Sequence, residues 1–150
     1  MSQSLAKNLI HLIYSTKNRA PCLGQDIQPR LFAYQAGILN DWECPAVVIG
    51  GASDHVHALF VLSKNHALAK VIEEVKKGSS KWLKTQGSEL RDFQWQAGYG
   101  AFSVSQSNAE EVRRYIEEQE EHHRTRSFQE EFLAFLTRHG MEFDERYLWD

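Results

Sequence analysis

The chain has 150 residues, of which 42% are apolar and 25% are charged, a composition typical of one folded domain. No apolar run approaches the roughly 18 residues that a membrane helix needs, and the first residues lack the apolar core of a signal peptide. Cys22 and Cys44 have no metal-binding or disulfide spacing, so we expect reduced thiols in a cytoplasmic protein without a membrane segment.

The net charge of −3 argues against a general nucleic-acid coat protein, but the charge is unevenly distributed. Residues 1–106 carry 11 Lys/Arg against 8 Asp/Glu, a net +3, whereas residues 107–150 carry 6 against 12, a net −6. This asymmetry permits a basic working surface on the first part of the chain and an acidic, self-associating or solvated second part.

The first two thirds of the chain alternate strand and helix patterns. Apolar and β-branched runs predict strands at 5–15, 46–49 and 55–62 and an irregular strand region at 93–105. Helical spacing predicts helices at 27–42 and 66–86. Gly50, Gly51 and Ser53 predict the turn of a hairpin between the second and third strands.

The last third is predicted to be helical. The residues from Ser107 to Glu110 have the pattern of a capping box, which predicts a helix running to about residue 123, and a shorter helix follows at 128–139. The order β-α-β-β-α-β with extra helices predicts an α+β fold, a ferredoxin-like antiparallel sheet sandwich with additional C-terminal helices. We expect a single domain over residues 1–150.

The third predicted strand begins with two histidines. His55 and His57 are two residues apart, so in a strand their side chains point to the same face and can converge on one divalent cation. Asp54 is placed to orient one of the rings. Two polar residues on a wet sheet face would give the same pattern. However, Val56, Ala58, Phe60 and Leu62 form the apolar face, and the histidines share the other with Leu59 and Val61.

The helix predicted from residue 107 carries a second group of functional residues. Tyr115 and Gln119 are one turn apart on a stripe that also contains Val112, Ile116 and His123. Packing into the core explains the apolar members, but a buried glutamine needs hydrogen-bond partners or a metal ion. A tyrosine becomes a useful nucleophile toward phosphorus when a metal ion polarises the phosphate.

The sequence resembles the single-tyrosine HUH transposases of small bacterial insertion sequences, the IS200-like family. The HUH motif, His-hydrophobe-His, corresponds to residues 55–57, and the helical Tyr-x-x-x-Gln of that family corresponds to Tyr115 and Gln119. Residues 15–21 resemble the opening strand and turn of the family, and residues 77–80 resemble its middle helix.

This resemblance implies a function. His55, His57 and Gln119 would hold Mg²⁺ or Mn²⁺, and Tyr115 would attack a DNA phosphate to leave a 5′-phosphotyrosine link and a free 3′-OH. The substrate would be single-stranded DNA with hairpin ends, and no nucleotide cofactor would be needed. A homodimer is expected, with each active site shared between subunits. The sequence adds that Gly98 and Gly100 would make the strand before Ser107 flexible enough for the next helix to dock on a neighbouring sheet, and that pairing of subunits would cover Phe102 and Val104. The alternative is a monomer in which the tyrosine reaches the histidines of its own chain.

Other residues have weaker claims to a role. The lysines on one face of the helix at 66–86 could be solvated surface, but the resemblance makes Lys70, Lys77 and Lys81 candidates for phosphate contacts. Tyr99 could be the nucleophile, although its glycine neighbours favour a turn residue. His122 or His123 could replace or supplement Gln119 as a ligand, although a solvated helix end is the more usual explanation for both. His11 is expected to be a strand residue without a special role.

Two other functions compete with a transposase. A two-histidine phosphodiesterase needs two separate His-x-Ser/Thr motifs, and this chain has one His-x-His and no second copy. The alternative that remains is a non-catalytic or domesticated single-stranded nucleic-acid-binding protein of the same fold. Such a protein would stack bases on sheet aromatics, for which the sequence offers Tyr14, Phe60, Trp95 and Phe102.

Overall fold

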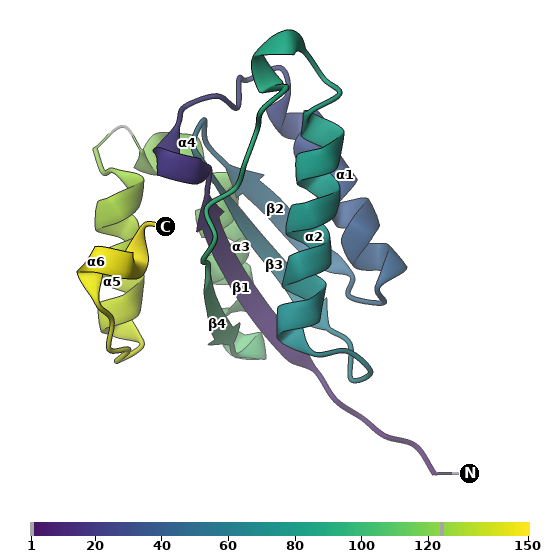
Figure 1. Cartoon of the computed structure of the whole chain (residues 1–150). Helices are drawn as coiled ribbons and strands as arrows, with labels where there is room; N and C mark the ends of the chain where they lie inside the picture. Colours follow the sequence, from purple (N-terminus) through teal and green to yellow (C-terminus); the bar gives the residue numbers. More distant parts are fainter. Residues whose placement is uncertain (1, 124) are drawn as a thin grey trace.

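The computed structural model describes residues 2–123 and 125–150 (Figure 1). A four-stranded antiparallel sheet with the strand order β2-β3-β1-β4 forms its centre. The strands are β1 (Asn8–Ser15), β2 (Ala46–Gly51), β3 (His55–Leu62) and β4 (Gly100–Val104). The helices are α1 (Gln28–Asp41), α2 (Leu68–Leu83), α3 (Ala109–Glu117), α4 (Gln119–His122), α5 (Phe128–Arg138) and α6 (Glu145–Leu148). Among these residues, no helix is both long and apolar enough to cross a membrane.

The predicted α+β fold and the order β-α-β-β-α-β are confirmed, with changes at the element ends. The first strand begins at Asn8 rather than at residue 5. The second strand continues through Gly50 and Gly51, so the hairpin turn lies at residues 52–54. Of the region 93–105, only Gly100–Val104 forms a strand of the sheet, although Trp95 makes an isolated bridge to Thr16.

One face of the sheet packs against α1 and α2 and forms the main core (Figure 1). Alternate residues of β1 and β3 point into this core, as the period of two residues in a strand requires. Val56, Ala58 and Phe60 are buried there and Leu62 packs against them, which confirms the predicted apolar face of β3. His55 and His57 therefore lie on the opposite face.

That opposite face is covered by α3 and α5 of the same chain. Phe102 is buried against α5, with its ring centroid 5.6 Å from that of Phe135, and Val104 packs in the cluster beneath α3. The expectation that Phe102 and Val104 need a second subunit to cover them is therefore wrong. A Cβ atom at Gly100 would overlap the Phe132 ring, so this glycine permits close packing rather than strand flexibility.

The predicted helix from residue 107 to 123 is interrupted. The capping box is not formed: Ser107 lies in a 3₁₀ turn (Gln106–Asn108), its hydroxyl contacts Ser105, and α3 begins at Ala109. The chain then breaks at Glu118 between α3 and α4. At this break the side-chain amide of Gln119 donates to the Tyr115 carbonyl at 3.3 Å, the oxygen that the Gln119 backbone N–H takes in a continuous helix.

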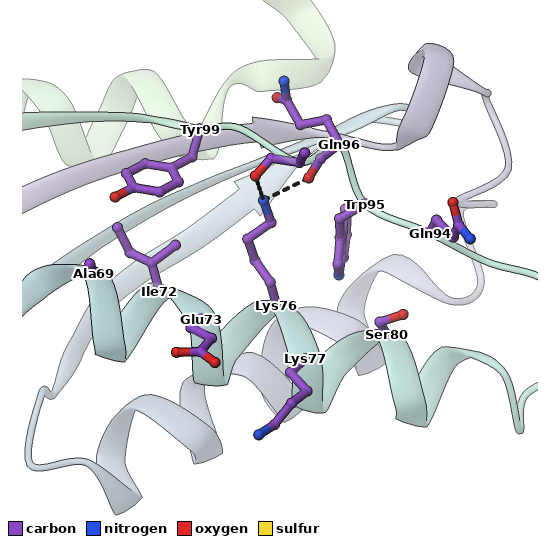
Figure 2. A pocket seen from close by; sticks show the side chains of 11 residues that line it. Ala69, Ile72, Glu73, Lys76, Lys77, Ser80, Gln94, Trp95, Gln96 and Tyr99 are labelled. Atoms are coloured by element: carbon purple, nitrogen blue, oxygen red, sulfur yellow. Dashed lines mark hydrogen bonds between the residues drawn. The ribbon is translucent and has the colours of Figure 1, made fainter. Parts of the chain in front are cut away.

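The segment between α2 and β4 is tied down by Lys76. Its ammonium group donates to the backbone carbonyls of Gln96 (2.7 Å), Ala97 (3.3 Å) and Gly98 (2.8 Å). Figure 2 shows this lysine reaching from α2 toward Gln96. The Gln96 side chain in turn accepts from the Ser15 backbone N–H at 2.8 Å. Ser15 pairs with His55 across the sheet, so this anchor supports the end of β3 that carries the histidines.

Replacement of Lys76 by methionine should destabilise the protein by about 1–3 kcal/mol, because three carbonyls lose a charged donor while the aliphatic stem is kept. Urea unfolding followed by circular dichroism measures this change. Lys77→Met is the matched control: its side chain is 67% exposed and it should change stability by about 0.5 kcal/mol or less. Equal losses in the two variants would contradict the anchoring role.

Candidate functional site

The two histidines of β3 form the floor of the site. His55 and His57 are fully buried and their ring centroids lie 5.2 Å apart. They occupy the face of a strand that is hydrogen-bonded on both sides, to β1 and to β2. The sheet therefore fixes the spacing of the two imidazoles.

Gln119 completes the predicted set of three. Its side chain is 1% exposed, and its Oε1 atom lies 3.0 Å from Nε2 of His55 and 3.0 Å from Nε2 of His123. His123 at the end of α4 thus joins the site rather than standing in solvent. His122 instead stacks on the Tyr115 ring with a centroid distance of 4.4 Å.

Glu131 of α5 is the residue that the sequence analysis missed. Its carboxylate is fully buried, with Oε1 2.8 Å from Nε2 of His57 and 3.4 Å from Nε2 of His123. The other oxygen, Oε2, accepts a hydrogen bond from the Tyr115 hydroxyl. Glu131 lies on the apolar stripe of Phe128 and Phe135, so, like the buried Gln119, it needs polar partners or a metal ion.

Two further residues contact the Nδ1 atoms of the two histidines and so orient their rings. Asp54 Oδ1 lies 2.7 Å from Nδ1 of His55, which is the orienting contact expected from its position. His11 Nε2 lies 2.8 Å from Nδ1 of His57. The expectation that His11 has no special role is therefore wrong, because β1 places it diagonally across from His57 on the same sheet face.

Burial and hydrogen bonding set the charges of the site. Burial lowers the pKa of His57 to about 4, which outweighs the opposite effect of Glu131, so this imidazole is neutral at pH 7. Burial would raise the pKa of Glu131, but the hydrogen bonds with His123 and His57 hold it well below its usual range. Burial and the neighbouring Glu131 carboxylate both raise the pKa of Tyr115, so the phenol is protonated.

These donor atoms fit a divalent cation. One ligand atom from each of His55, His57, His123 and Glu131 lies within 4.8 Å of all the others, and the Gln119 oxygen lies beside them. Two ligands about 2.1 Å from one octahedral ion lie about 3.0 Å apart when adjacent and about 4.2 Å apart when opposite. Small movements of these side chains would therefore bring their donor atoms to bonding distance of one ion. The charge of that ion would also offset the buried negative charge of Glu131.

The other residues considered lie elsewhere in the fold. Lys70, Lys77 and Lys81 lie on α2, which packs against the sheet face opposite His55 and His57. Lys70 and Lys77 form ion pairs with Glu74 at 3.1 and 3.3 Å. Tyr99 lines the pocket between α2 and residues 94–99, beside Lys76 (Figure 2). The structure therefore brings Tyr115, not Tyr99, to the histidines.

Comparison with protein families identifies the chain. The family model described as "Transposase IS200 like" matches residues 4–119, well over half of the sequence. The chain belongs to the IS200-like transposase family. His123 and Glu131 lie after the matched region. Two members of the donor cluster therefore come from the part of this transposase-family chain that the family model does not cover. Comparison with curated proteins gives no significant match.

Solved structures share the fold. A crystal structure of a candidate transposase from Deinococcus radiodurans R1 is 21% identical, with a TM-score of 0.62 over 79% of this chain and 98% of that chain. A REP-associated tyrosine transposase bound to a REP hairpin is 14% identical, with a TM-score of 0.54 over 79% of this chain and 70% of that chain. At these identities the likeness establishes the common architecture.

Glu131→Gln should weaken divalent-metal binding at least about tenfold, because it keeps the side-chain shape but removes the negative charge. The measurement is the rise in thermal midpoint when Mn²⁺ is added to protein stripped with EDTA. Glu130→Gln changes the neighbouring, exposed carboxylate of α5 and should behave like the unaltered chain. A full Mn²⁺ response in Glu131→Gln would exclude this carboxylate as a ligand.

Proposed function

We propose that this chain is a metal-dependent transposase that cleaves and rejoins single-stranded DNA through a 5′-phosphotyrosine intermediate on Tyr115. The observation that supports this most strongly is the shared carboxylate of Glu131. It accepts from the Tyr115 hydroxyl through one oxygen and contacts His57 and His123 through the other. The candidate nucleophile therefore lies at the edge of a donor cluster suited to a metal ion.

In the proposed reaction, the Tyr115 oxygen forms a bond to phosphorus and the bond from phosphorus to the 3′ oxygen breaks. Glu131 accepts the hydrogen bond of the phenol and so orients the attacking oxygen; the phenolic proton is released to solvent, and the departing oxygen takes up a proton from solvent to become a 3′-OH. A cation held by His55, His57, Gln119, His123 and Glu131 would polarise the phosphate. Because the phosphotyrosine bond retains the energy of the DNA linkage, rejoining by a 3′-OH needs no nucleotide cofactor.

The donor set favours Mn²⁺ over Mg²⁺. Three imidazoles accompany one carboxylate and one amide oxygen, whereas Mg²⁺ prefers oxygen ligands and water. The proposed substrate is single-stranded DNA with hairpin ends, supported by the related fold of the REP-associated tyrosine transposase that binds a REP hairpin. Phosphate contacts by Lys70, Lys77 and Lys81 remain part of this proposal.

The non-catalytic alternative has less support. Base stacking on the sheet would require open aromatic rings, but Tyr14, Phe60, Trp95 and Phe102 are all at most 8% exposed. Helices pack against both faces of the sheet and cover these rings. An enzyme accounts for the buried polar cluster, for which a stacking surface has no use.

Tyr115→Phe should abolish covalent adducts with single-stranded DNA while preserving the fold, because the ring still packs against Phe135 and His122. The measurement is a denaturing gel of protein mixed with labelled hairpin-ended strands and Mn²⁺. Tyr99→Phe is the control and should form adducts normally. Adducts that persist in Tyr115→Phe, or that vanish in Tyr99→Phe instead, would reject the assignment.

A homodimer remains a proposal, but the structure weakens the argument for shared active sites. Within one chain, the Tyr115 ring lies 5.9 Å from the His57 ring, and the proposed ligands come from the same chain. We therefore propose that each site is built from a single chain, whether or not two chains associate through another surface.

Mixing a His55→Ala protein with a Tyr115→Phe protein distinguishes the two arrangements. If each site belongs to one chain, both subunits of a mixed dimer stay inactive and the mixture forms no adduct. Recovery of cleavage after subunit exchange would show that the tyrosine of one subunit serves the histidines of the other.

A further inference from the structure

A cavity of about 220 Å³ is lined in part by Tyr115. Its walls come from α3, from α5 and from His11 of β1. The volume is below the ~300–1,000 Å³ typical of pockets for drug-sized ligands, so it suits a group the size of one nucleobase. The proposed reaction leaves this cavity without a role.

Two arginines contribute to the cavity wall, one from just before α5 and one from its last residue. Arg126 and Arg138 both line it, and both are exposed. Among the side chains that the structure describes, neither forms an ion pair, in contrast to Arg113, which pairs with Glu110 and Glu117. The positive charge of Arg126 acts on the Tyr115 hydroxyl and favours its ionised form. Glu111 is the single carboxylate among the lining residues described.

Part of the cavity wall is aromatic and apolar. Phe135 and Tyr115 both line it, with ring centroids 5.7 Å apart in an edge-to-face arrangement. Val112 and Ala134 complete the apolar part of the wall. The Arg138 guanidinium lies over the Phe135 ring, 5.5 Å from its centroid. Aromatic rings beside guanidinium groups are the combination that binds a base together with its phosphate.

We propose that this cavity binds one nucleotide adjacent to the phosphodiester that Tyr115 attacks. The base lies against Phe135, and Arg126 and Arg138 contact the phosphates on its two sides. Because Tyr115 itself forms part of the wall, a nucleotide bound there places its neighbouring phosphate at the phenol. The inference rests on the proposed function and adds to it a subsite that positions the strand for cleavage.

The test measures binding apart from cleavage. Wild-type protein in EDTA is titrated against a short fluorescein-labelled single-stranded oligonucleotide of mixed sequence, and fluorescence anisotropy is recorded at several salt concentrations. The double variant Arg126→Gln/Arg138→Gln should bind about tenfold or more weakly. The slope of log affinity against log salt should also become shallower by about 1.4, the value for two lost phosphate contacts with a single strand.

Two further variants separate the base from the phosphates. Phe135→Leu removes the ring, and Ala134→Phe fills the cavity while both arginines remain. Each should weaken binding with an unchanged salt slope, because no charge is lost. Arg91→Gln is the control: this arginine is exposed, lies outside the cavity, and should leave affinity unchanged. Circular dichroism shows whether each variant is folded.

The same variants assayed for adducts with Mn²⁺ separate failure of this inference from failure of the proposed function. Wild-type adducts together with unchanged binding by the arginine double variant and by Ala134→Phe would overturn the subsite alone. Absence of adducts in the wild type would overturn the proposed reaction. Weaker binding confined to the arginine variants would show an electrostatic contact without a base pocket and would also overturn the subsite.

Discussion

The buried carboxylate of Glu131 is the constraint on which the rest of the site depends. An ionised carboxylate removed from water costs several kcal/mol unless hydrogen-bond donors surround it. Here the donors come from three other places: His57 on β3, His123 at the end of α4, and Tyr115 on α3. One charge therefore fixes α5, the sheet and the broken helix relative to one another, and it holds the phenol beside the imidazoles.

Apolar packing brings these elements close enough for that to happen. Phe128, Phe132 and Leu136 of α5 bury against Phe102 and Ile13 of the sheet. A second cluster, formed by Leu9, Leu59 and Ile116, does the same for α3. Each such side chain contributes about 1.5–3 kcal/mol when fully buried, so the two clusters can offset the cost of the polar residues enclosed between them. The site is thus a buried cluster of polar side chains between two small apolar cores.

The break at Glu118 shapes the candidate site. It separates the helix that carries Tyr115 from the turn that carries Gln119 and His123, and the Gln119 amide bridges the two by donating to the Tyr115 carbonyl. The same side chain presents its oxygen to His55 and His123. One glutamine therefore both stabilises the irregular backbone and supplies a candidate ligand, which explains why a polar residue occupies a buried stripe.

The sequence by itself determined the strand and helix order and the two faces of β3, because these follow from periods of two and of 3.6 residues along the chain. It placed Tyr115 and Gln119 one helical turn apart but did not predict the break at Glu118 between them. It could not determine where α5 lies. Local periodicity marks Glu131 as a polar residue on an apolar stripe, but only packing against Phe102 decides that the stripe faces the histidines. The roles of His11 and His123 likewise depend on neighbours distant in sequence, and those contacts exist only once the chain is folded.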